Sequence, residues 1–449
     1  MTTDTIAAVA TAPGLGGIGI VRISGPDAER ILREIFVPAG GDNRPMESNR
    51  LTLGTLKDED RELDRCMAVI MRAPKSYTRE DVAELQLHGG GFLVREALEL
   101  CIRRGARLAE PGEFTRRAFL NGRIDLSQAE AVMRLISARG EQQHRAALRQ
   151  LEGGASQFIR RAADQLYDLQ AGIAACIDYP EEVTEEEGTA RLKEGLEKLI
   201  RTLKSAADER SSRLIEEGLR VALIGRPNVG KSSLLNALLG EERAIVTSIP
   251  GTTRDVIRGE ITLDGIPVTL TDTAGIRETD DPVEKIGVDR SRKASREAEL
   301  SLLVLDASEP LAEEDLALLR ELPENSAAVL NKTDLAECIT AEDIVRERPG
   351  IPCVICSALE PDSLEPVKNL IRRYTEVNDR LALTQPRHLE AISRAVGHLE
   401  DALKTAASET LDLAAVDLQA AQAALAEITG DQADEKLLDR IFEQFCVGK

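Results

Sequence analysis

The sequence predicts an α/β plus α fold, with an N-terminal α/β domain, a helical domain split in sequence, and a doubly wound α/β domain inserted into it. Residues 1–118 alternate short apolar runs with Gly and Pro turns, which is typical of mixed α/β structure. Residues 119–217 and 377–449 repeat apolar positions every three or four residues, which indicates helices. Residues 218–376 alternate apolar strands with helical stretches. We expect the two helical parts to pack together, because neither alone has enough partners.

The composition narrows the class of protein. With 449 residues the chain is too long for one core. Aromatic residues make up 2% and Trp is absent, so the cores must consist of Leu, Ile, Val and Ala. The net charge of −21 argues against a basic nucleic-acid-binding face over the whole surface. Seven Cys without a disulfide-type pattern, and a start without a basic leader, predict a cytoplasmic protein.

One segment predicts a phosphate-binding loop. GRPNVGKS, residues 225–232, follows the strand pattern RVALI and precedes the helix pattern SLLNALL. Glycines at these positions let backbone N–H groups surround phosphates, while Lys231 reaches the β- and γ-phosphates and the Ser232 hydroxyl binds Mg²⁺. The strand–loop–helix context makes a chance glycine-rich turn a poor alternative.

A second motif, DTAG at residues 272–275, ends an apolar strand downstream of this loop. Asp272 is placed for a water-mediated Mg²⁺ contact, and the Gly275 amide for the γ-phosphate. Ras-like GTPases carry a Gln directly after this motif to orient the attacking water. The residue here is Ile276, so another group must place the water.

Two further motifs predict guanine specificity. In NKTD, residues 331–334, the Asp334 carboxylate can accept hydrogen bonds from both N1–H and the exocyclic amine of guanine. Adenine offers no such pair of donors, so a buried carboxylate would disfavour ATP. In SAL, residues 357–359, the Ala358 amide is placed for guanine O6. The four motifs in this order predict a Ras-like P-loop G domain and an enzyme that hydrolyses GTP.

Longer blocks extend the pattern to the whole chain. They are GRPNVGKSSLLNAL, IVTSIPGTTRD, DTAGIRETDDPVEKIG, ATAPGLGGIGIVRISGP, PGEFTRRAFLNGRIDLSQAEA and the terminus FCVGK. With these blocks the chain resembles the MnmE (TrmE) family of tRNA-modification GTPases over essentially all its residues. The resemblance implies a folate-binding N-terminal α/β domain (1–118), a helical domain in two parts (119–217 and 377–449), and an inserted G domain (218–376).

The resemblance also implies the ligand contacts. Mg²⁺ would bind Ser232 and Thr253, and K⁺ would bind Asn228, Thr247, Ile249 and Thr252. Glu284 would be the catalytic group that orients the attacking water. The expected nucleotide-binding residues are Asn228, Val229, Gly230, Lys231, Ser232, Ser233, Thr247, Ser248, Ile249, Pro250, Gly251, Thr252, Thr253, Asp272, Thr273, Ala274, Gly275, Asn331, Lys332, Asp334, Ser357, Ala358 and Leu359.

A folate site and partners follow from the same resemblance. A 5-formyl- or 5,10-methylene-tetrahydrofolate would contact Arg22, Glu84, Arg123 and Lys449; family members usually carry Lys at the position of Arg123. The family forms a homodimer through the N-terminal domain and acts with the flavoprotein MnmG (GidA). Together they add an aminomethyl or carboxymethylaminomethyl group to C5 of the wobble uridine of certain tRNAs, with a carbon from tetrahydrofolate.

Some alternatives stay open. A regulatory switch GTPase in ribosome assembly would share parts of the G-domain pattern, although it needs neither the N-terminal block nor FCVGK. Cys353 and Cys356 form a C-x-x-C that reads better as buried core than as a metal site, because a second pair is missing. Cys446 is either a nucleophile or a buried residue that anchors the tail. We expect Leu437, Leu438, Ile441 and Phe445 to share one helix face and pack.

Overall fold

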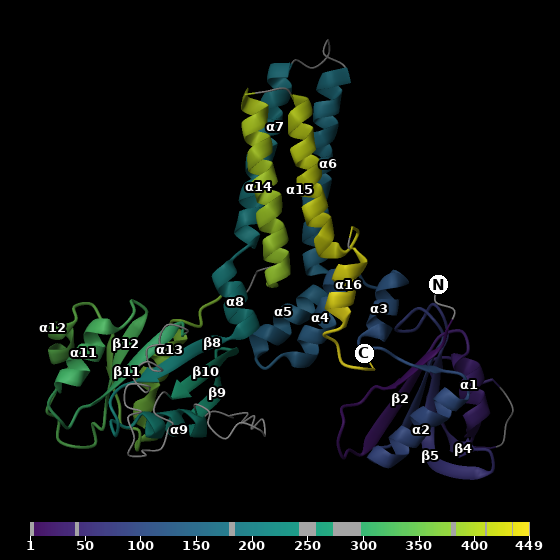
Figure 1. Cartoon of the computed structure of the whole chain (residues 1–449), viewed down its shortest axis with the longest axis horizontal. Coiled ribbons are helices and arrows are strands. Elements are labelled where there is room, and N and C mark those ends of the chain that lie inside the picture. Colours follow the sequence, from purple (N-terminus) through teal and green to yellow (C-terminus); the bar gives the residue numbers. More distant parts are fainter. Residues whose placement is uncertain are drawn as a thin grey trace. The chain divides into compact units, whose positions relative to one another are not determined.

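The computed structural model describes residues 4–40, 45–178, 185–241, 257–272, 298–378, 383–408, 411–432 and 434–448 (Figure 1). The chain divides into two compact units. Unit 1 comprises residues 1–133, 150–196 and 397–449, and unit 2 comprises residues 134–149 and 197–396. The fold class is α/β plus α, as predicted. No helix in the described ranges is long and apolar enough to cross a membrane.

Unit 1 contains a seven-stranded sheet in the order β3-β4-β5-β6-β2-β1-β7. Neighbouring strands are antiparallel except β1 and β7, which are parallel. The helices α1 (Ala28–Ile35) and α2 (Gly91–Arg103) pack on this sheet through a shared core of Ile, Leu, Val and Ala. The strands are β1 (Ile6–Val9), β2 (Ile18–Ser24), β3 (Phe36–Pro38), β4 (Thr52–Asp58), β5 (Arg61–Met71), β6 (Val82–His88) and β7 (Arg107–Leu108).

The chain also contains several long helices. They are α4 (Leu126–Ser137), α5 (Glu141–Leu151), α6 (Gly154–Asp178), α7 (Glu185–Ala206), α14 (Pro386–Ser408) and α15 (Leu411–Thr429). Within unit 1, α6 packs along α15, although more than 200 residues separate them in sequence (Figure 1). Leu166 and Leu418 are among the fully buried residues of these two helices. The two helical stretches therefore do pack together, as expected.

The first predicted helical part, residues 119–217, closes with two helices, because α7 ends at Ala206 and α8 (Glu209–Glu217) begins after a break. Asp208 caps α8 by accepting a hydrogen bond from Ser211 N at 3.0 Å. A capping side chain competes with continued helix at this position, and periodicity alone does not reveal it.

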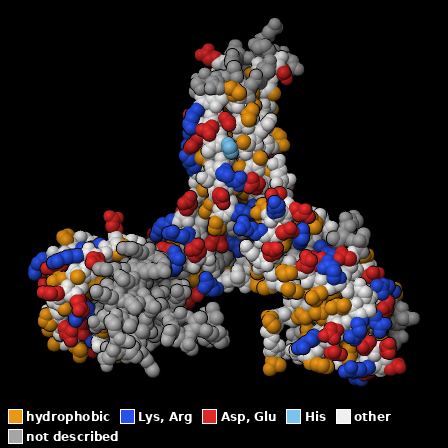
Figure 2. Space-filling view, viewed as in Figure 1, with side chains coloured by type: hydrophobic (Ala, Val, Ile, Leu, Met, Phe, Trp, Pro, Cys, Tyr) orange, Lys and Arg blue, Asp and Glu red, His pale blue; other side chains and the backbone are white. Residues whose placement is uncertain are grey.

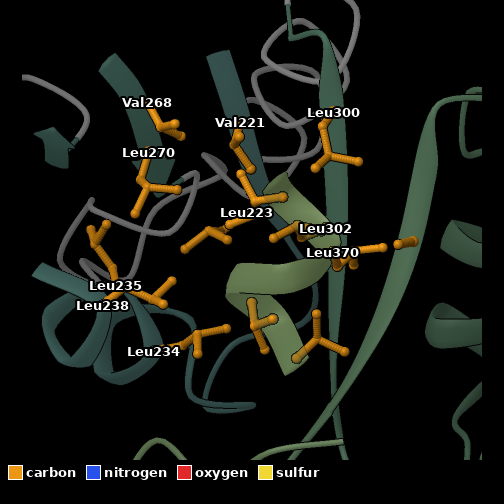
Figure 3. Packing of buried hydrophobic residues seen from close by; sticks show 14 of the residues in the cluster. Val221, Leu223, Leu234, Leu235, Leu238, Val268, Leu270, Leu300, Leu302 and Leu370 are labelled. Atoms are coloured by element: carbon orange, nitrogen blue, oxygen red, sulfur yellow. The ribbon is translucent and has the colours of Figure 1, made fainter. Parts of the chain in front are cut away.

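Unit 2 contains a six-stranded sheet in the order β13-β12-β11-β8-β10-β9, parallel except for β9. A hairpin joins β9 and β10 through Asp264 and Gly265, both with positive φ. Figure 3 shows one face of the sheet packed against α9 and α13 through residues such as Leu223, Leu234 and Leu370. The helices α11 and α12 contribute to the other core. The elements are β8 (Leu219–Ile224), α9 (Lys231–Glu241), β9 (Ile257–Leu263), β10 (Ile266–Asp272), β11 (Leu300–Asp306), α11 (Glu313–Glu321), β12 (Ser326–Asn331), α12 (Ala341–Glu347), β13 (Cys353–Ile355) and α13 (Glu365–Arg372).

The C-terminal helix α16 (Glu435–Phe442) packs against α3 (Glu113–Leu120) in unit 1. Phe442 and Phe445 are buried, with ring centroids 5.3 Å apart. Leu437, Leu438 and Ile441 are only partly buried around them. The predicted face therefore packs, but Phe442, which the prediction omitted, is its centre.

Candidate functional site

The loop between β8 and α9 has a backbone that few residue types can adopt. Asn228 has φ 64° and Gly230 has φ 96°. A Cβ at Gly230 would also collide with the Asn331 side-chain amide. The loop therefore curls tightly around its own centre, which is the geometry that directs successive N–H groups toward one bound anion.

Lys231 lies inside this loop. Its Nζ donates to the carbonyl oxygens of Gly225 (2.8 Å) and Arg226 (2.6 Å), and only 4% of the residue is exposed. Burial lowers the pKa of the ammonium group, and the Asp272 charge opposes this shift only in part. The two carbonyl oxygens are neutral and do not neutralise the charge of the buried ammonium group, so the group is well suited to bind an anionic ligand.

Ser232 and Asp272 meet beside it. Ser232 Oγ lies 2.5 Å from Asp272 Oδ2, and Asp272 is fully buried at the end of β10. The pair combines a hydroxyl and a carboxylate oxygen, which are donors that Mg²⁺ prefers. The parallel strands place these groups at the same sheet edge as the phosphate loop.

Asn331 ties three segments together. Its Nδ2 donates to Val229 O at 2.9 Å, and its Oδ1 accepts from Ala358 N at 3.0 Å. The side chain is 1% exposed. It therefore fixes the phosphate loop relative to the SAL segment, and its position next to Gly230 explains why that glycine cannot carry a side chain.

The rest of the NKTD motif is held by short contacts. Lys332 Nζ lies 2.5 Å from Asp306 Oδ2, at the end of β11. Burial raises the pKa of Asp306, but hydrogen bonds from Lys332 and Ser308 outweigh it and hold the pKa below its ordinary range. Ser357 Oγ donates to Asp334 Oδ1 at 2.5 Å. Asp334 is thus oriented by a neighbour on the SAL segment, while Leu359 is 78% exposed.

Arg226, inside the loop sequence, pairs with Asp315 of α11. Its Nε lies 2.8 Å from each of the two Asp315 carboxylate oxygens. Sequence reasoning missed this contact, because 89 residues separate the partners and no spacing rule links them. It also missed Asp306, although the position of this residue at the end of the apolar run LSLLVLD, residues 300–306, could have singled it out.

A second group of polar and aromatic side chains lies in unit 1, at the pairing of β2 with β6. Arg22 Nε contacts Glu84 Oε1 at 2.7 Å, and the guanidinium lies 5.7 Å from the Tyr77 ring centroid and 5.6 Å from that of Phe114. Arg123 reaches the same Tyr77 ring at 5.3 Å. Two cations, a carboxylate and two rings therefore converge at one place.

The C-terminal tail reaches this place. Gly448 O accepts a weak hydrogen bond from Arg22 Nη1 at 3.4 Å, and Val447 forms a β-bridge with Pro111. Gly448 has φ 94°, and a Cβ there would collide with the carbonyl oxygen of Val9. Cys446 is exposed, so the interpretation of a buried anchoring thiol is wrong; Phe445, at 6% exposure, is the anchor.

Two protein-family models match this chain. The MnmE helical domain family matches residues 126–446, and the N-terminus of the GTP-binding protein TrmE matches residues 5–123. The tRNA modification GTPase MnmE of Heliobacterium modesticaldum is 48% identical over 100% of both chains.

The chain belongs to the MnmE family of tRNA modification GTPases. The MnmE of Clostridioides difficile is 45% identical over 99% of both chains, and that of Bacillus subtilis is 44% identical over 99% of this chain and 100% of the relative. Among solved structures, the G domain of the T. maritima FeoB iron transporter is 30% identical, covering 35% of this chain and 99% of that domain, with a TM-score of 0.29.

Membership of the MnmE family makes the chain a GTPase, which confirms the activity predicted from the four motifs. The structure brings the described nucleotide residues to one edge of the unit 2 sheet. Several expected MnmE site residues lie outside the described residues: Thr247, Ser248, Ile249, Pro250, Gly251, Thr252, Thr253, Thr273, Ala274, Gly275, Glu284 and Lys449, together with Ile276.

Of the C-x-x-C pair in this MnmE member, Cys356 is buried as expected of a core residue, whereas Cys353 is only partly buried. Burial raises the pKa of the Cys356 thiol to about 12 and that of Cys353 to about 11, so neither forms a thiolate readily. Within the described ranges, no three His, Cys, Asp or Glu residues are grouped for a metal ion.

Proposed function

We propose that the chain uses GTP hydrolysis to drive modification of tRNA, in which an aminomethyl or carboxymethylaminomethyl group is added to C5 of the wobble uridine. The observation that carries this proposal is the position of the C-terminal tail, which contacts Arg22 next to the Arg22–Glu84 ion pair. A simple GTP-dependent switch has no need of a second polar site reached by the chain terminus. The relatives are named tRNA modification GTPases over their full length, which supports tRNA as the substrate.

In the G domain, guanine would be read by Asp334 and the Ala358 amide. The Ser357 hydroxyl holds Asp334, and Asn331 holds Ala358, so both reading groups are oriented in advance. Lys231 would bind the phosphates in place of its two loop carbonyls. Bound Mg²⁺ would supply charge neutralisation, and Ser232 would be its ligand together with Thr253.

For hydrolysis, we assign the orientation of the attacking water to Glu284. K⁺ would supply the positive charge that an arginine finger provides in other GTPases. Its proposed ligands are Asn228, Thr247, Ile249 and Thr252. Asn228 is exposed and has a left-handed backbone conformation within the phosphate loop, which supports this assignment because its side chain is accessible to an ion.

We assign the unit 1 site to a tetrahydrofolate that carries the one-carbon unit. Arg22, Arg123 and Lys449 would bind its carboxylates or ring oxygen, and Glu84 would accept from ring N–H groups. The rings of Tyr77 and Phe114 offer flat apolar surfaces for a pterin. Tyr77 is itself fixed by a hydrogen bond with Thr115 at 2.9 Å.

We further propose a cytoplasmic homodimer that joins through the N-terminal domain (1–118) and works with the flavoprotein MnmG; the helical domain (119–217 and 377–449) and G domain (218–376) complete the chain. Leu15, Ile18 and Phe92 are 99%, 63% and 68% exposed. A hydrogen bond from Gly89 N to Gly17 O, at 3.4 Å, brings the loop of Leu15 and Ile18 to the start of α2. Figure 2 shows hydrophobic side chains gathered on one side of the N-terminal domain, and such a patch favours association.

Mass spectrometry of tRNA nucleosides tests the proposal. A strain without this gene should lack the modified wobble uridine and regain it with the intact chain. Lys231→Ala should not restore it, because phosphate binding is lost, whereas the exposed-surface variant Arg50→Ala should. Normal tRNA modification in the deletion strain would contradict the proposal and favour a switch in ribosome assembly.

A further inference from the structure

The main chain of Arg226 is part of the phosphate loop, whereas its side chain reaches out of the loop to α11. The side chain pairs with Asp315, through the Nε contacts of 2.8 Å. The Nη2 atom of Arg226 also lies 3.8 Å from Glu309 Oε2. The exposed fractions of the Arg226 and Asp315 side chains are 22% and 3%, so the ion pair is largely sheltered from solvent.

Asp315 is fixed independently of Arg226. Its Oδ2 accepts from the backbone N–H of Ala312 at 3.1 Å, which caps the first turn of α11. Leu319, one turn further along the helix, is buried in the core against β11 and β12. The carboxylate is thus part of a rigid helix start, and the arginine is tied to it rather than the reverse.

The main chain of Arg226 closes the connection to the phosphate site. Its carbonyl oxygen is one of the two acceptors of Lys231 Nζ, at 2.6 Å. Moving Arg226 would therefore move the acceptor of the lysine and the first turn of the loop together.

We propose that the Arg226–Asp315 ion pair is a positioning device for GTP hydrolysis. By tying the first turn of the phosphate loop to α11, it sets the position of the loop amides and of Lys231 before nucleotide binds. Neither residue touches the nucleotide in this proposal. Preorganised phosphate ligands lower the cost of ordering the loop on binding, so the pair raises affinity and supports the rate.

Removing Arg226 alone would leave a buried charge behind. Without Arg226, the buried Asp315 carboxylate keeps only the Ala312 amide as a partner among the contacts described, which is costly for a sheltered charge. Arg226→Lys keeps a cation that can reach the same carboxylate. It therefore serves as the rescuing variant, while Arg226→Gln removes the charge at similar length.

The experiment uses the full chain and five variants: Arg226→Gln, Arg226→Lys, Asp315→Asn, the Gln/Asn double variant, and Arg320→Gln as a matched control. Arg320 lies on the same helix and forms an exposed ion pair with Glu347 at 3.7 Å. Affinity for GDP with a fluorescent methylanthraniloyl group, the kcat and KM of GTP hydrolysis, and the unfolding temperature without nucleotide are measured for each.

Arg226→Gln and Asp315→Asn should each weaken GDP binding, and should each lower kcat/KM of GTP hydrolysis by up to about 100-fold, which is the effect of a misplacement of about 1 Å. The double variant should bind GDP no more weakly than the weaker-binding of the two single variants, because both substitutions remove one shared contact. Arg226→Lys should stay within about threefold of the parent, and Arg320→Gln should not change. A lower unfolding temperature with unchanged affinity in the folded fraction would overturn the proposal, as would additive losses in the double variant. If Arg226→Gln does not fold, the contrast between Arg226→Lys and Asp315→Asn decides in the same way.

Discussion

Substituting Gly448 by Ala should unseat the C-terminal tail and leave the rest of the chain intact. A φ of 94° is strained for Ala, and its Cβ would meet the main-chain oxygen of Val9, which cannot move aside without displacing β1. Strain of this kind costs about 1–3 kcal/mol. Since 1.4 kcal/mol corresponds to a factor of ten, the docked tail should become about 5- to 150-fold less populated.

The expected result is selective. The tail contributes the Pro111–Val447 bridge and the Arg22 contact, whereas Phe445 remains to anchor α16. GTP hydrolysis should therefore stay near the parent rate, while binding of 5-formyl-tetrahydrofolate, measured by calorimetry, should weaken and tRNA modification should fall.

Gly40→Ala is the matched control. Gly40 has a φ of 103° in the same unit, but a Cβ there meets nothing within 4 Å. The control therefore carries the backbone strain without the collision. Folate binding and modification at parent levels in Gly448→Ala, with a normal fold, would refute the role of the tail.

Four further results are expected. Replacing K⁺ by Na⁺ should lower the kcat of GTP hydrolysis by about 10-fold or more, with arginine-finger removal as an upper guide of about 10³–10⁵; equal rates in the two salts would count against the role of K⁺. Glu284→Ala should lose hydrolysis but keep GTP affinity, and a large loss of affinity would count against its role in orienting water. Burial raises the pKa of Glu113, but the hydrogen bonds from Arg107, Glu110 N and Arg117 outweigh it and hold the pKa below its ordinary range. The charged carboxylate therefore stabilises the fold fully above the ordinary pKa, and this stabilisation is lost as pH falls through the lower folded pKa. Glu113→Gln should accordingly flatten the fall of unfolding temperature between about pH 5 and pH 3, and an unchanged slope would contradict this. Because Cys446 is exposed, Cys446→Ser should fold normally; lost tRNA modification would then indicate a chemical role for the thiol, and retained modification would exclude one.

Much of the nucleotide site was predictable because each motif carries its own local geometry. The phosphate loop needs a strand before it and a helix after it, and the sequence shows both around residues 225–232. NKTD and SAL each follow a short apolar run in a segment predicted to alternate strands and helices, so their place at one sheet edge follows from parallel pairing. The link between Asn331 and Ala358 is a consequence of that edge.

Contacts between distant segments were not predictable in this way. Arg226 and Asp315 meet only because α11 packs beside the loop, and neither residue type is unusual at its position. The tail is similar: a packed face was expected for α16, yet the burial of Phe442 depends on Phe119, whose ring centroid lies 6.4 Å away on α3. Periodicity gives a face but not its partner.

The proposed function requires that tRNA modification depend on GTP that is read by Asp334. Asp334→Asn exchanges the paired acceptor for one donor and one acceptor, so GTP affinity should collapse and xanthosine triphosphate should bind instead. In a reaction reconstituted with the flavoprotein partner, folate and tRNA, the variant should form modified wobble uridine with xanthosine triphosphate and not with GTP, while the parent chain should show the opposite preference. Modification that proceeds equally with either nucleotide, or without any, would contradict the account.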